Sequence, residues 1–398
     1  MKCIIPEISW HNRDPVLSVD IQTSGIEPEF YRLVSGGTDS HVLIWHVTKK
    51  KDGVLELECV CDLTRHQKAV NAVKFSPDGK FLASADDESH IIIWKRGEKT
   101  DVPDLDGDSS VSNVENVEHW VQVKVLRGHL EDIYDLYWSP DSLYLASGSV
   151  DNTCIVWDVE KGKRLSILAD AKNFIQGVCW DPLNKHVATI SSDGKCRIYN
   201  AKTHKLTFST GRCRPPGAKA DDKAIKLFQD DTLRTYFRRL QFSPDGQLLT
   251  VPAGIIESDE SNGARQNVTW LFTRKQLNRC ALYYPHGREP SMVTRWCPLK
   301  FKLRPDVKPI IALPYRMILA VATRSSIIIY DSQCAVPIGL VSNIHYTKLT
   351  DLTWSADATI LIASSTDGYC SVVTFAAGEL GEVYVDTAVA SECAKPDC

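Results

Sequence analysis

Short runs of alternating apolar and polar residues recur along most of the chain, and many of them end in a turn rich in Pro, Asp and Gly. Residues 70–75 form one such run, which the turn Ser76-Pro77-Asp78-Gly79 follows. Because Pro presets φ and Gly tolerates a positive φ, this turn is suited to joining two antiparallel strands. A second run, a tight polar turn and a third run ending in an aromatic residue complete the unit. The pattern therefore predicts three antiparallel strands per unit.

This unit is repeated along the chain. Residues 66–94 and 129–157 align without a gap, which places His66 on His129 and Trp94 on Trp157. Weaker copies open at His11, residue 175, Phe237, residue 291 and His345. The aromatic residues that end the third runs are Trp45, Trp94, Trp157, Tyr199, Trp270, Tyr330 and Phe375. Their shortest spacing, 42 residues, is typical of a four-stranded propeller blade, and the longer spacings indicate insertions.

These repeats resemble the WD-repeat family and predict an all-β, seven-bladed WD-repeat β-propeller over residues 1–376. The last blade lacks its fourth strand, and the apolar stretch Lys2–Ser9 has no partner of its own. Pairing the two closes the ring with the N-terminal strand and removes the exposed sheet edges. Residues 377–398 are small and polar, and we expect a flexible C-terminal tail there, either a linker or a truncation point.

The WD-repeat resemblance also implies a hydrogen-bonded set of His, Ser or Thr, Asp and Trp in each blade. Blades one and three have complete sets, whereas blade two has Glu88 in place of the Asp, with Asp87 beside it. The predicted members are His11, Ser35, Asp39, Trp45, His66, Ser84, Trp94, His129, Ser147, Asp151 and Trp157. The incomplete sets retain Thr189, Asp193 and Tyr199 in blade four, and His345 and Asp367 in blade seven. Because this spacing repeats from blade to blade, we interpret the sets as structural rather than catalytic.

Composition narrows the possible functions. The chain has 398 residues, a formal net charge of −4 and a pI near 6.3, so it lacks the basic excess of a protein that binds DNA mainly through phosphates. DNA contact is therefore expected to be indirect. No apolar run approaches the ~18–20 residues of a membrane span, and the start of the chain is not expected to be a secretory signal. The 13 cysteines include no CxxC, and no catalytic or nucleotide-binding motif occurs, so no metal, cofactor or enzyme activity is predicted.

Two insertions of opposite charge interrupt the repeats. The first, residues 100–118, carries six acidic residues and no basic residue between Asp101 and Glu118. It is either a solvated loop that is held open by self-repulsion or a surface for a basic partner such as a histone. The candidate histone-facing residues are Asp101, Asp104, Asp106 and Asp108.

The second insertion, residues 211–236, ends close to a cluster of Arg, Tyr and Phe. Such side chains are typical of interface hot spots, so we consider Arg234, Tyr236 and Arg239 as a candidate interface with a large partner subunit. The alternative is that the aromatic rings only pack beneath the propeller rim. Strand alternation turns Arg238 inward, and we expect it to have a carboxylate partner within the propeller.

Several phrases extend the resemblance beyond generic WD repeats: HNRDPVLSVD, RGHLEDIYDLYW, FRRLQFSPDGQLLTVPAG, LPYRMILAVAT and VSNIHYTKLTDLTWS. Together they are similar to the family of WD-repeat middle subunits of chromatin assembly factor one. This resemblance implies a nuclear, non-catalytic scaffold subunit of a histone chaperone complex that acts in DNA replication and repair. The complex deposits histones H3 and H4 onto newly replicated DNA. The implied partners are the large and small subunits of that factor, histones H3 and H4, and an Asf-type histone chaperone, whose docking motif is absent from this chain.

Three alternatives remain open from the sequence. A replication-independent histone-regulator propeller shares the fold and the histones, and only its partners distinguish it. A substrate receptor of a cullin ubiquitin ligase usually carries an Arg two places after the Asp of its WD pair, whereas here Trp157-Asp158 is followed by Val159 and Glu160. An enzyme propeller needs clustered carboxylates or metal ligands at the mouth of its channel, and none can be recognised from the sequence.

Overall fold

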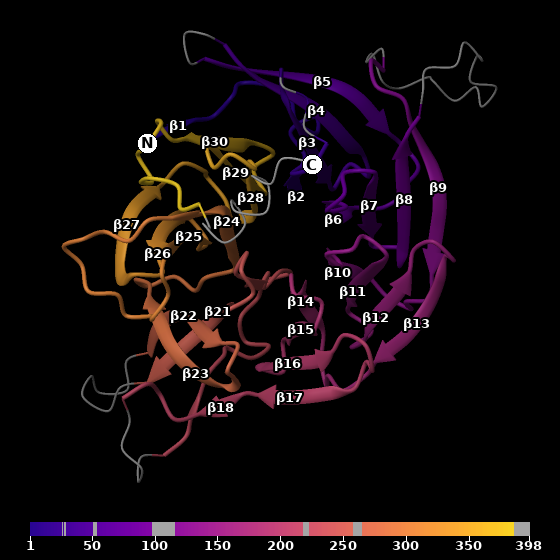
Figure 1. The fold of residues 1–398 in the computed structure, drawn as a ribbon. Coiled ribbons are helices and arrows are strands. Elements are labelled where there is room, and N and C mark those ends of the chain that lie inside the picture. The colour runs from indigo at the N-terminus through magenta and orange to yellow at the C-terminus, as the bar shows by residue number, and fades with distance from the viewer. Residues whose placement is uncertain are drawn as a thin grey trace, which may run out of the picture.

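The computed structural model describes residues 1–25, 27, 29–50, 54–97, 116–217, 223–257 and 265–385. Strands and turns make up these residues, and no helix among them is long and apolar enough to cross a membrane. The strands form seven four-stranded antiparallel sheets, which are arranged as a ring (Figure 1). The predicted all-β, seven-bladed propeller is confirmed.

In each blade the strands follow one another from the centre of the ring outwards (Figure 1). Blade one contains β2 (Val16–Ile21), β3 (Tyr31–Gly37), β4 (Val42–Lys49) and β5 (Leu55–Leu63). Blade two contains β6 (Val70–Phe75), β7 (Phe81–Asp86), β8 (His90–Arg96) and β9 (Trp120–Arg127). Blade three contains β10 (Ile133–Trp138), β11 (Tyr144–Ser149), β12 (Cys154–Asp158) and β13 (Lys163–Leu168).

The second half of the ring is more irregular. Blade four contains β14 (Ile175–Trp180), β15 (His186–Ser191), β16 (Lys195–Asn200) and β17 (Leu206–Thr210), and the insertion after it forms the short pair β18 (Arg212–Cys213) and β19 (Ile225–Lys226). Blade five contains β20 (Gln241–Phe242), β21 (Leu248–Glu257), β22 (Arg265–Thr273) and β23 (Gln276–Pro285). Blade six contains β24 (Val293–Phe301), β25 (Arg316–Ala322), β26 (Ser326–Asp331) and β27 (Cys334–Ser342). Blade seven contains β28 (Leu349–Trp354), β29 (Ile360–Ser365) and β30 (Cys370–Thr374).

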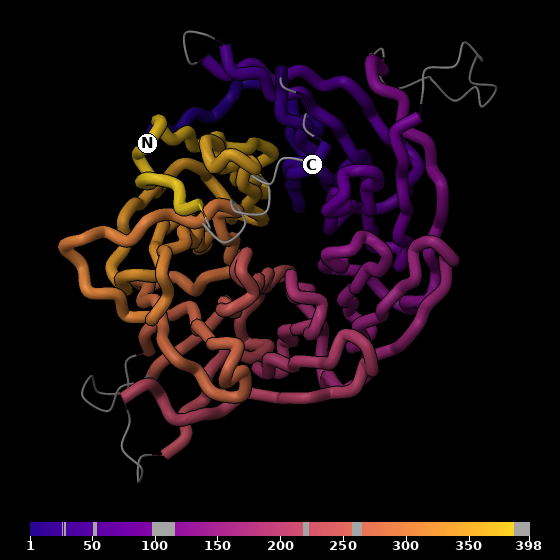
Figure 2. The backbone as a smooth tube through the Cα atoms, viewed as in Figure 1, coloured from indigo at the N-terminus to yellow at the C-terminus, as the bar shows by residue number. Residues whose placement is uncertain are grey.

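The N-terminal strand closes the ring as predicted. β1 (Lys2–Ile4) pairs antiparallel with β30 and becomes the fourth strand of blade seven. The tube in Figure 2 shows the first strand meeting the last blade. β1 is shorter than the predicted stretch Lys2–Ser9, because Pro6 has no N–H to donate to the ladder.

The core lies between neighbouring blades. Every residue of β6 is buried, because both of its faces pack against other blades, whereas β13 at the rim is largely exposed. Val34 and Ile44 of blade one, for example, share one apolar cluster with Val73 and Leu82 of blade two. Burial of apolar area between blades therefore stabilises the ring as a whole as well as each sheet.

Residues 377–385, which were predicted to begin the flexible tail, instead return to blade six. Val383 forms an antiparallel bridge with Phe301, and Leu380 is buried in the apolar cluster between blades six and seven. The predicted domain boundary is therefore too early, because the burial of Leu380 and the backbone pairing hold these residues on the propeller. The rest of the predicted tail lies outside the described residues.

Candidate functional site

The structure brings the predicted side chains of blades one and three into closed hydrogen-bonded sets. In blade three, Ser147 Oγ lies 2.6 Å from His129 Nε2 and accepts a hydrogen bond of 2.8 Å from Trp157 Nε1. Asp151 Oδ2 lies 2.8 Å from His129 Nδ1. The same pattern, with distances of 2.8 to 2.9 Å, joins the predicted set of blade one: His11, Ser35, Asp39 and Trp45. Each His is buried and both of its ring nitrogens are occupied, so these sets hold the blades together.

In blade two the acidic partner differs from the expectation. His66 Nδ1 lies 2.6 Å from Asp86, not from Glu88 or Asp87, and its Nε2 lies 2.6 Å from Ser84, which also accepts from Trp94. Asp86 is the last residue of β7. It lies two residues before Glu88, the position at which the acidic partner was expected. The path of the chain at the end of β7, rather than alignment with the other blades, therefore decides which carboxylate completes the set.

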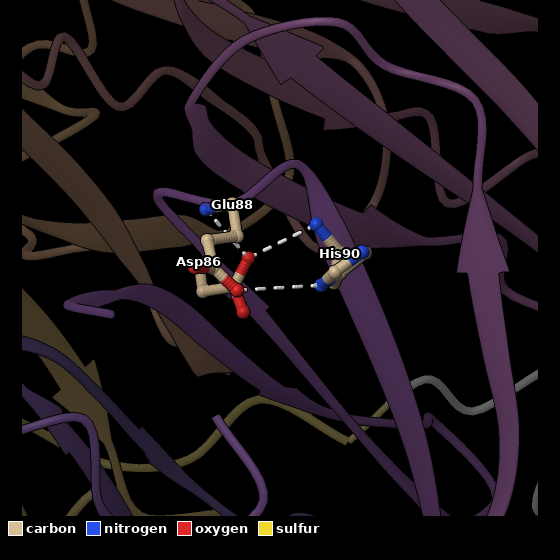
Figure 3. A group of neighbouring side chains, drawn as sticks. All are labelled: Asp86, Glu88 and His90. Atoms are coloured by element: carbon tan, nitrogen blue, oxygen red, sulfur yellow. Dashed lines mark hydrogen bonds and ion pairs between the residues drawn. The ribbon is translucent and has the colours of Figure 1, made fainter. Parts of the chain in front are cut away.

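Asp86 at the end of β7, Glu88 in the turn that follows and His90 at the start of β8 lie together and offer the donor types of a metal site (Figure 3). Asp86 Oδ1, however, accepts the backbone N–H groups of Glu88 and His90 at 2.9 Å each, and its other oxygen is paired with His66. Burial raises the pKa of Asp86, but the hydrogen bonds from His66 and from the backbone outweigh it and lower the pKa below its usual range. Since both oxygens of Asp86 already have partners, we interpret Asp86, Glu88 and His90 as residues that stabilise the turn rather than as metal ligands.

Blades four and seven build modified sets. In blade four, which has Ala171 where a His would stand, Arg197 pairs with Asp193 at 2.6 Å, and within the described residues the Thr189 hydroxyl has no hydrogen-bond partner. In blade seven, His345 Nδ1 lies 3.0 Å from Asp367, and a serine of β30, Ser371, lies 2.7 Å from Nε2.

The largest difference from the sequence-based expectation concerns Arg239. This side chain is fully buried on the axis of the ring rather than exposed at an interface. Its guanidinium forms an ion pair of 2.6 Å with Asp351 and one of 3.4 Å with Asp135, and it donates to the backbone carbonyl of Asn71 at 2.6 Å. It also donates to the carbonyl oxygen of Leu17. Arg239 of blade five therefore contacts blades one, two, three and seven, and the interface prediction for it is wrong.

Further charges surround Asp351, which is buried on the same axis. Arg295 of blade six lies 2.9 Å from Asp351, Lys74 of blade two lies 3.6 Å from it, and the Ser18 hydroxyl of blade one donates to it at 2.9 Å. Burial raises the pKa of Asp351, but the positive charges of Arg239, Lys74 and Arg295 hold it well below its usual range. We call Lys74, Asp135, Arg239, Arg295 and Asp351 the axial network.

Arg238 differs from the prediction only in its hydrogen-bond partners. It is buried as expected, but its guanidinium donates to the backbone carbonyls of Gln229 and Asp230 instead of to a carboxylate side chain. Burial lowers the pKa of Arg238 to about 10. The insertion folds back over this side chain, so backbone oxygens meet its hydrogen-bonding needs.

Arg234 and Tyr236 remain at the surface, at the mouth of the ring where the first strands begin. Tyr236 is 64% exposed, and its ring makes an edge-to-face contact with Tyr134 at 5.9 Å. Phe237 next to it is buried beneath these rings. Two of the three predicted interface residues, Arg234 and Tyr236, are thus accessible.

The acidic insertion has one end within the described residues. Glu118 is buried and forms an ion pair of 2.6 Å with Arg32 of blade one, while Trp120 Nε1 donates to it at 2.8 Å and His46 lies 2.8 Å away. Burial raises the pKa of Glu118, but the hydrogen bonds from Arg32, Trp120 and His46 lower it to about 2. Glu118 therefore ties blade two to blade one. The four candidate residues Asp101, Asp104, Asp106 and Asp108 lie outside the described residues.

The opposite mouth of the ring, where the first strands end, holds a cavity of about 270 Å³. Charged or polar residues from five blades contribute to its wall: Asp20, Lys74, Tyr137, Gln241 and Arg295. This mouth and the axial network were not predicted from the sequence. The available signal was the charge at inward positions of otherwise apolar first strands, such as Lys74 within residues 70–75.

A comparison with known families agrees with this fold. The model of the CAF1B/HIR1 beta-propeller domain family matches residues 1–380. The chain belongs to this family. The CAF1B/HIR1 family is one of propeller subunits and not of enzymes, in keeping with closed polar sets in place of an open catalytic constellation.

Individual members of the CAF1B/HIR1 family show how the similarity is distributed. The B subunit of chromatin assembly factor 1 from Gallus gallus is 42% identical over 98% of this chain and 72% of that protein. The protein of the same name from Saccharomyces cerevisiae is 31% identical over 92% of this chain and 84% of that protein. Protein HIR1 of Kluyveromyces lactis is 27% identical over 94% of this chain and 44% of that protein. The resemblance recognised in the sequence is confirmed.

Proposed function

We propose that this chain is the non-catalytic propeller subunit of a nuclear histone chaperone complex that assembles chromatin. The observation that carries the proposal is the membership of nearly the whole chain in the CAF1B/HIR1 family. The rigid ring, with its buried axial network and its accessible aromatic and basic residues at one mouth, suits a scaffold to which other subunits attach.

Within this function we favour replication-coupled deposition of histones H3 and H4, together with the large and small subunits of chromatin assembly factor one. Identity of 42% to the chicken factor, against 27% to the HIR1 protein, supports this choice over the replication-independent alternative.

The test is purification of a tagged chain from nuclear extract, followed by identification of its partners and an assay of nucleosome assembly on replicating DNA. Recovery of the large subunit and of H3 and H4, with assembly that depends on the chain, is the expected result. Recovery of HIR-complex subunits without the large subunit would overturn the replication-coupled assignment.

For the large-subunit interface we propose the surface formed by Arg234 and Tyr236. An exposed Tyr offers a large contact area with few rotatable bonds, and an exposed Arg offers planar hydrogen bonds to carboxylates. The partner segment is expected to be acidic. The double variant Arg234→Glu with Tyr236→Ala should abolish pull-down of the large subunit and leave the melting temperature unchanged.

The matched control for this surface is Arg164→Glu with Leu165→Ala, an exposed pair on β13 at the rim of blade three. It introduces the same charge change at a distant place and should bind normally. Equal binding by both double variants would remove the Arg234 and Tyr236 surface from consideration.

For the histones we propose the acidic insertion with Asp101, Asp104, Asp106 and Asp108. Its excess of acidic residues suits a basic partner. Changing all four to Asn should weaken histone retention by the complex, and the effect should shrink as the salt concentration rises above ~0.15 M. Unchanged retention at low salt would leave the insertion as a solvated connector.

A further inference from the structure

Two cysteines far apart in the sequence meet where the insertion leaves blade four. Cys213 belongs to β18, and Cys280 belongs to β23, the outer strand of blade five. Their sulfur atoms lie 2.7 Å apart, so only a short side-chain movement separates them from the bonding distance of about 2 Å. Cys213 is partly exposed, whereas Cys280 is buried. One sulfur of the pair is thus accessible from solvent, with the second directly behind it.

The surroundings shift the pKa values of the two cysteines in opposite directions. The contact with the Cys280 sulfur lowers the pKa of Cys213, and the positive charge of Arg279 acts in the same direction. The hydrogen bond to Cys213, together with burial, raises the pKa of Cys280. Of the two sulfurs, that of Cys213 is therefore the one that deprotonates more readily.

Cys59 and Cys61, the two cysteines nearest to each other in the sequence, differ from this pair. Burial raises the pKa of Cys59 to about 11 and that of Cys61 to about 12, so both are protonated at neutral pH. Low pKa, access and a neighbouring thiol are the three features of a cysteine that reacts reversibly with oxidants. Cys213 combines all three.

We propose that Cys213 and Cys280 form a redox-reactive pair that closes to a disulfide when a hydroperoxide reaches Cys213. The Cys213 thiolate attacks the terminal peroxide oxygen, which forms a sulfenic acid on Cys213 and releases the other oxygen as hydroxide or alkoxide. The Cys280 sulfur then attacks the Cys213 sulfur. Together with the Cys280 proton, the sulfenic OH leaves as water. Both cysteines are oxidised by one electron each, and the peroxide is reduced by two.

Closure of this pair has a defined structural consequence. Cys213 lies at the start of the insertion of residues 211–236, and Cys280 lies in a four-stranded blade. The disulfide would therefore fasten the base of the insertion to the outer strand of blade five. This inference goes beyond the proposed function, because it concerns the isolated chain and requires no partner.

The experiment uses the full chain with Cys393→Ser and Cys398→Ser, which removes the two cysteines outside the described residues. The reduced protein is treated with iodoacetamide at pH 7, and alkylation is followed by peptide mass spectrometry. Cys213 should react at least ~10-fold faster than Cys59, which is also partly exposed. Equal rates at the two cysteines would overturn the proposal.

A second sample is treated with a small excess of hydrogen peroxide and digested without reduction. A peptide linking Cys213 to Cys280, lighter than the two free peptides by two hydrogen atoms and split again by dithiothreitol, is the expected product. In Cys280→Ser the sulfenic acid on Cys213 should persist and be trapped by dimedone. Recovery of both cysteines as free thiols, or over-oxidation of Cys213 without any linked peptide, would overturn the proposal.

Discussion

Buried polar side chains find their hydrogen-bond partners in different ways in blade three and at the centre of the ring. In blade three, His129, Ser147, Asp151 and Trp157 satisfy one another within a single sheet and the loop that precedes it. On the axis, the partners of Arg239 come from four other blades. Buried polar groups need partners in both places. The blade-three set stabilises one blade, whereas the axial network stabilises the relative placement of the blades.

The axial network should be the more sensitive of the two. Arg239→Ala leaves the buried Asp135 without its ion-pair partner and leaves a cavity on the axis. Removal of one member of a buried ion pair typically costs about 3–5 kcal/mol, so the free energy of unfolding should fall by that amount. Chemical denaturation followed by tryptophan fluorescence measures it.

The control for this variant is Arg164→Ala, an exposed arginine of the rim, which should change stability by less than ~0.5 kcal/mol. A loss below ~1 kcal/mol for Arg239→Ala would mean that the axial network does not hold the blades together.

The set of blade three should come second. Ser147→Ala removes the acceptor of the Trp157 indole N–H and the partner of His129 Nε2, and both groups stay buried. Leaving such groups unsatisfied should cost about 2–3 kcal/mol in the free energy of unfolding. Thermal melts of Ser147→Ala and of Ser192→Ala, which alters a buried serine of blade four whose hydroxyl has no hydrogen-bond partner within the described residues, separate this effect from general repacking. Equal melts for the two would contradict the special role of Ser147.

The pair of Glu118 and Arg32 joins only two blades, and the effect of breaking it should be the smallest at neutral pH. Glu118→Gln should cost about 1–2 kcal/mol at pH 7, because a charge-assisted bond is lost while the indole N–H of Trp120 keeps an acceptor. The pKa of Glu118 is lowered from 4.5 to about 2 in the folded state. A carboxyl with a lowered folded-state pKa stabilises the protein above its unfolded value, and this contribution is lost as the pH falls towards the folded value.

The stability difference between the natural chain and Glu118→Gln should therefore shrink as the pH falls from about 4.5 to about 2. Urea denaturation at a series of pH values measures it, with the exposed Glu58→Gln as the control. A stability difference that stays constant over this pH range would contradict a lowered pKa of Glu118 in the folded protein.

The blades themselves could be predicted from local signals. Each signal lies within a short stretch of chain, and a propeller blade is built from such stretches. Examples are the alternation of residues 70–75, the turn at Pro77 and Gly79, and the alignment of His66 with His129. Gly79 has the positive φ of 72° that its turn required. The closing strand was also predictable, because an unpaired edge in blade seven needs a partner.

The roles of Arg238 and Arg239 could not be predicted in the same way. Strand alternation suggested that Arg238 points inward and that Arg239 points outward, but both are buried. The prediction treated the inner strand of blade five as a plain strand with one covered face. In the ring, one of these arginines is covered by the returning insertion and the other by the opposite blades.

The sequence by itself determined the number of blades, their order and the complete sets of blades one and three, because each of these depends on residues within one repeat or on neighbouring repeats. The tertiary structure alone decided the partners of Arg239, the choice of Asp86 in blade two and the meeting of Cys213 with Cys280. The partners of Arg239 and the cysteine pair depend on how segments up to 222 residues apart in the chain meet once the ring has closed. The choice of Asp86 as the partner of His66 depends on the exact path of the chain at a single turn. No local pattern specifies either kind of contact.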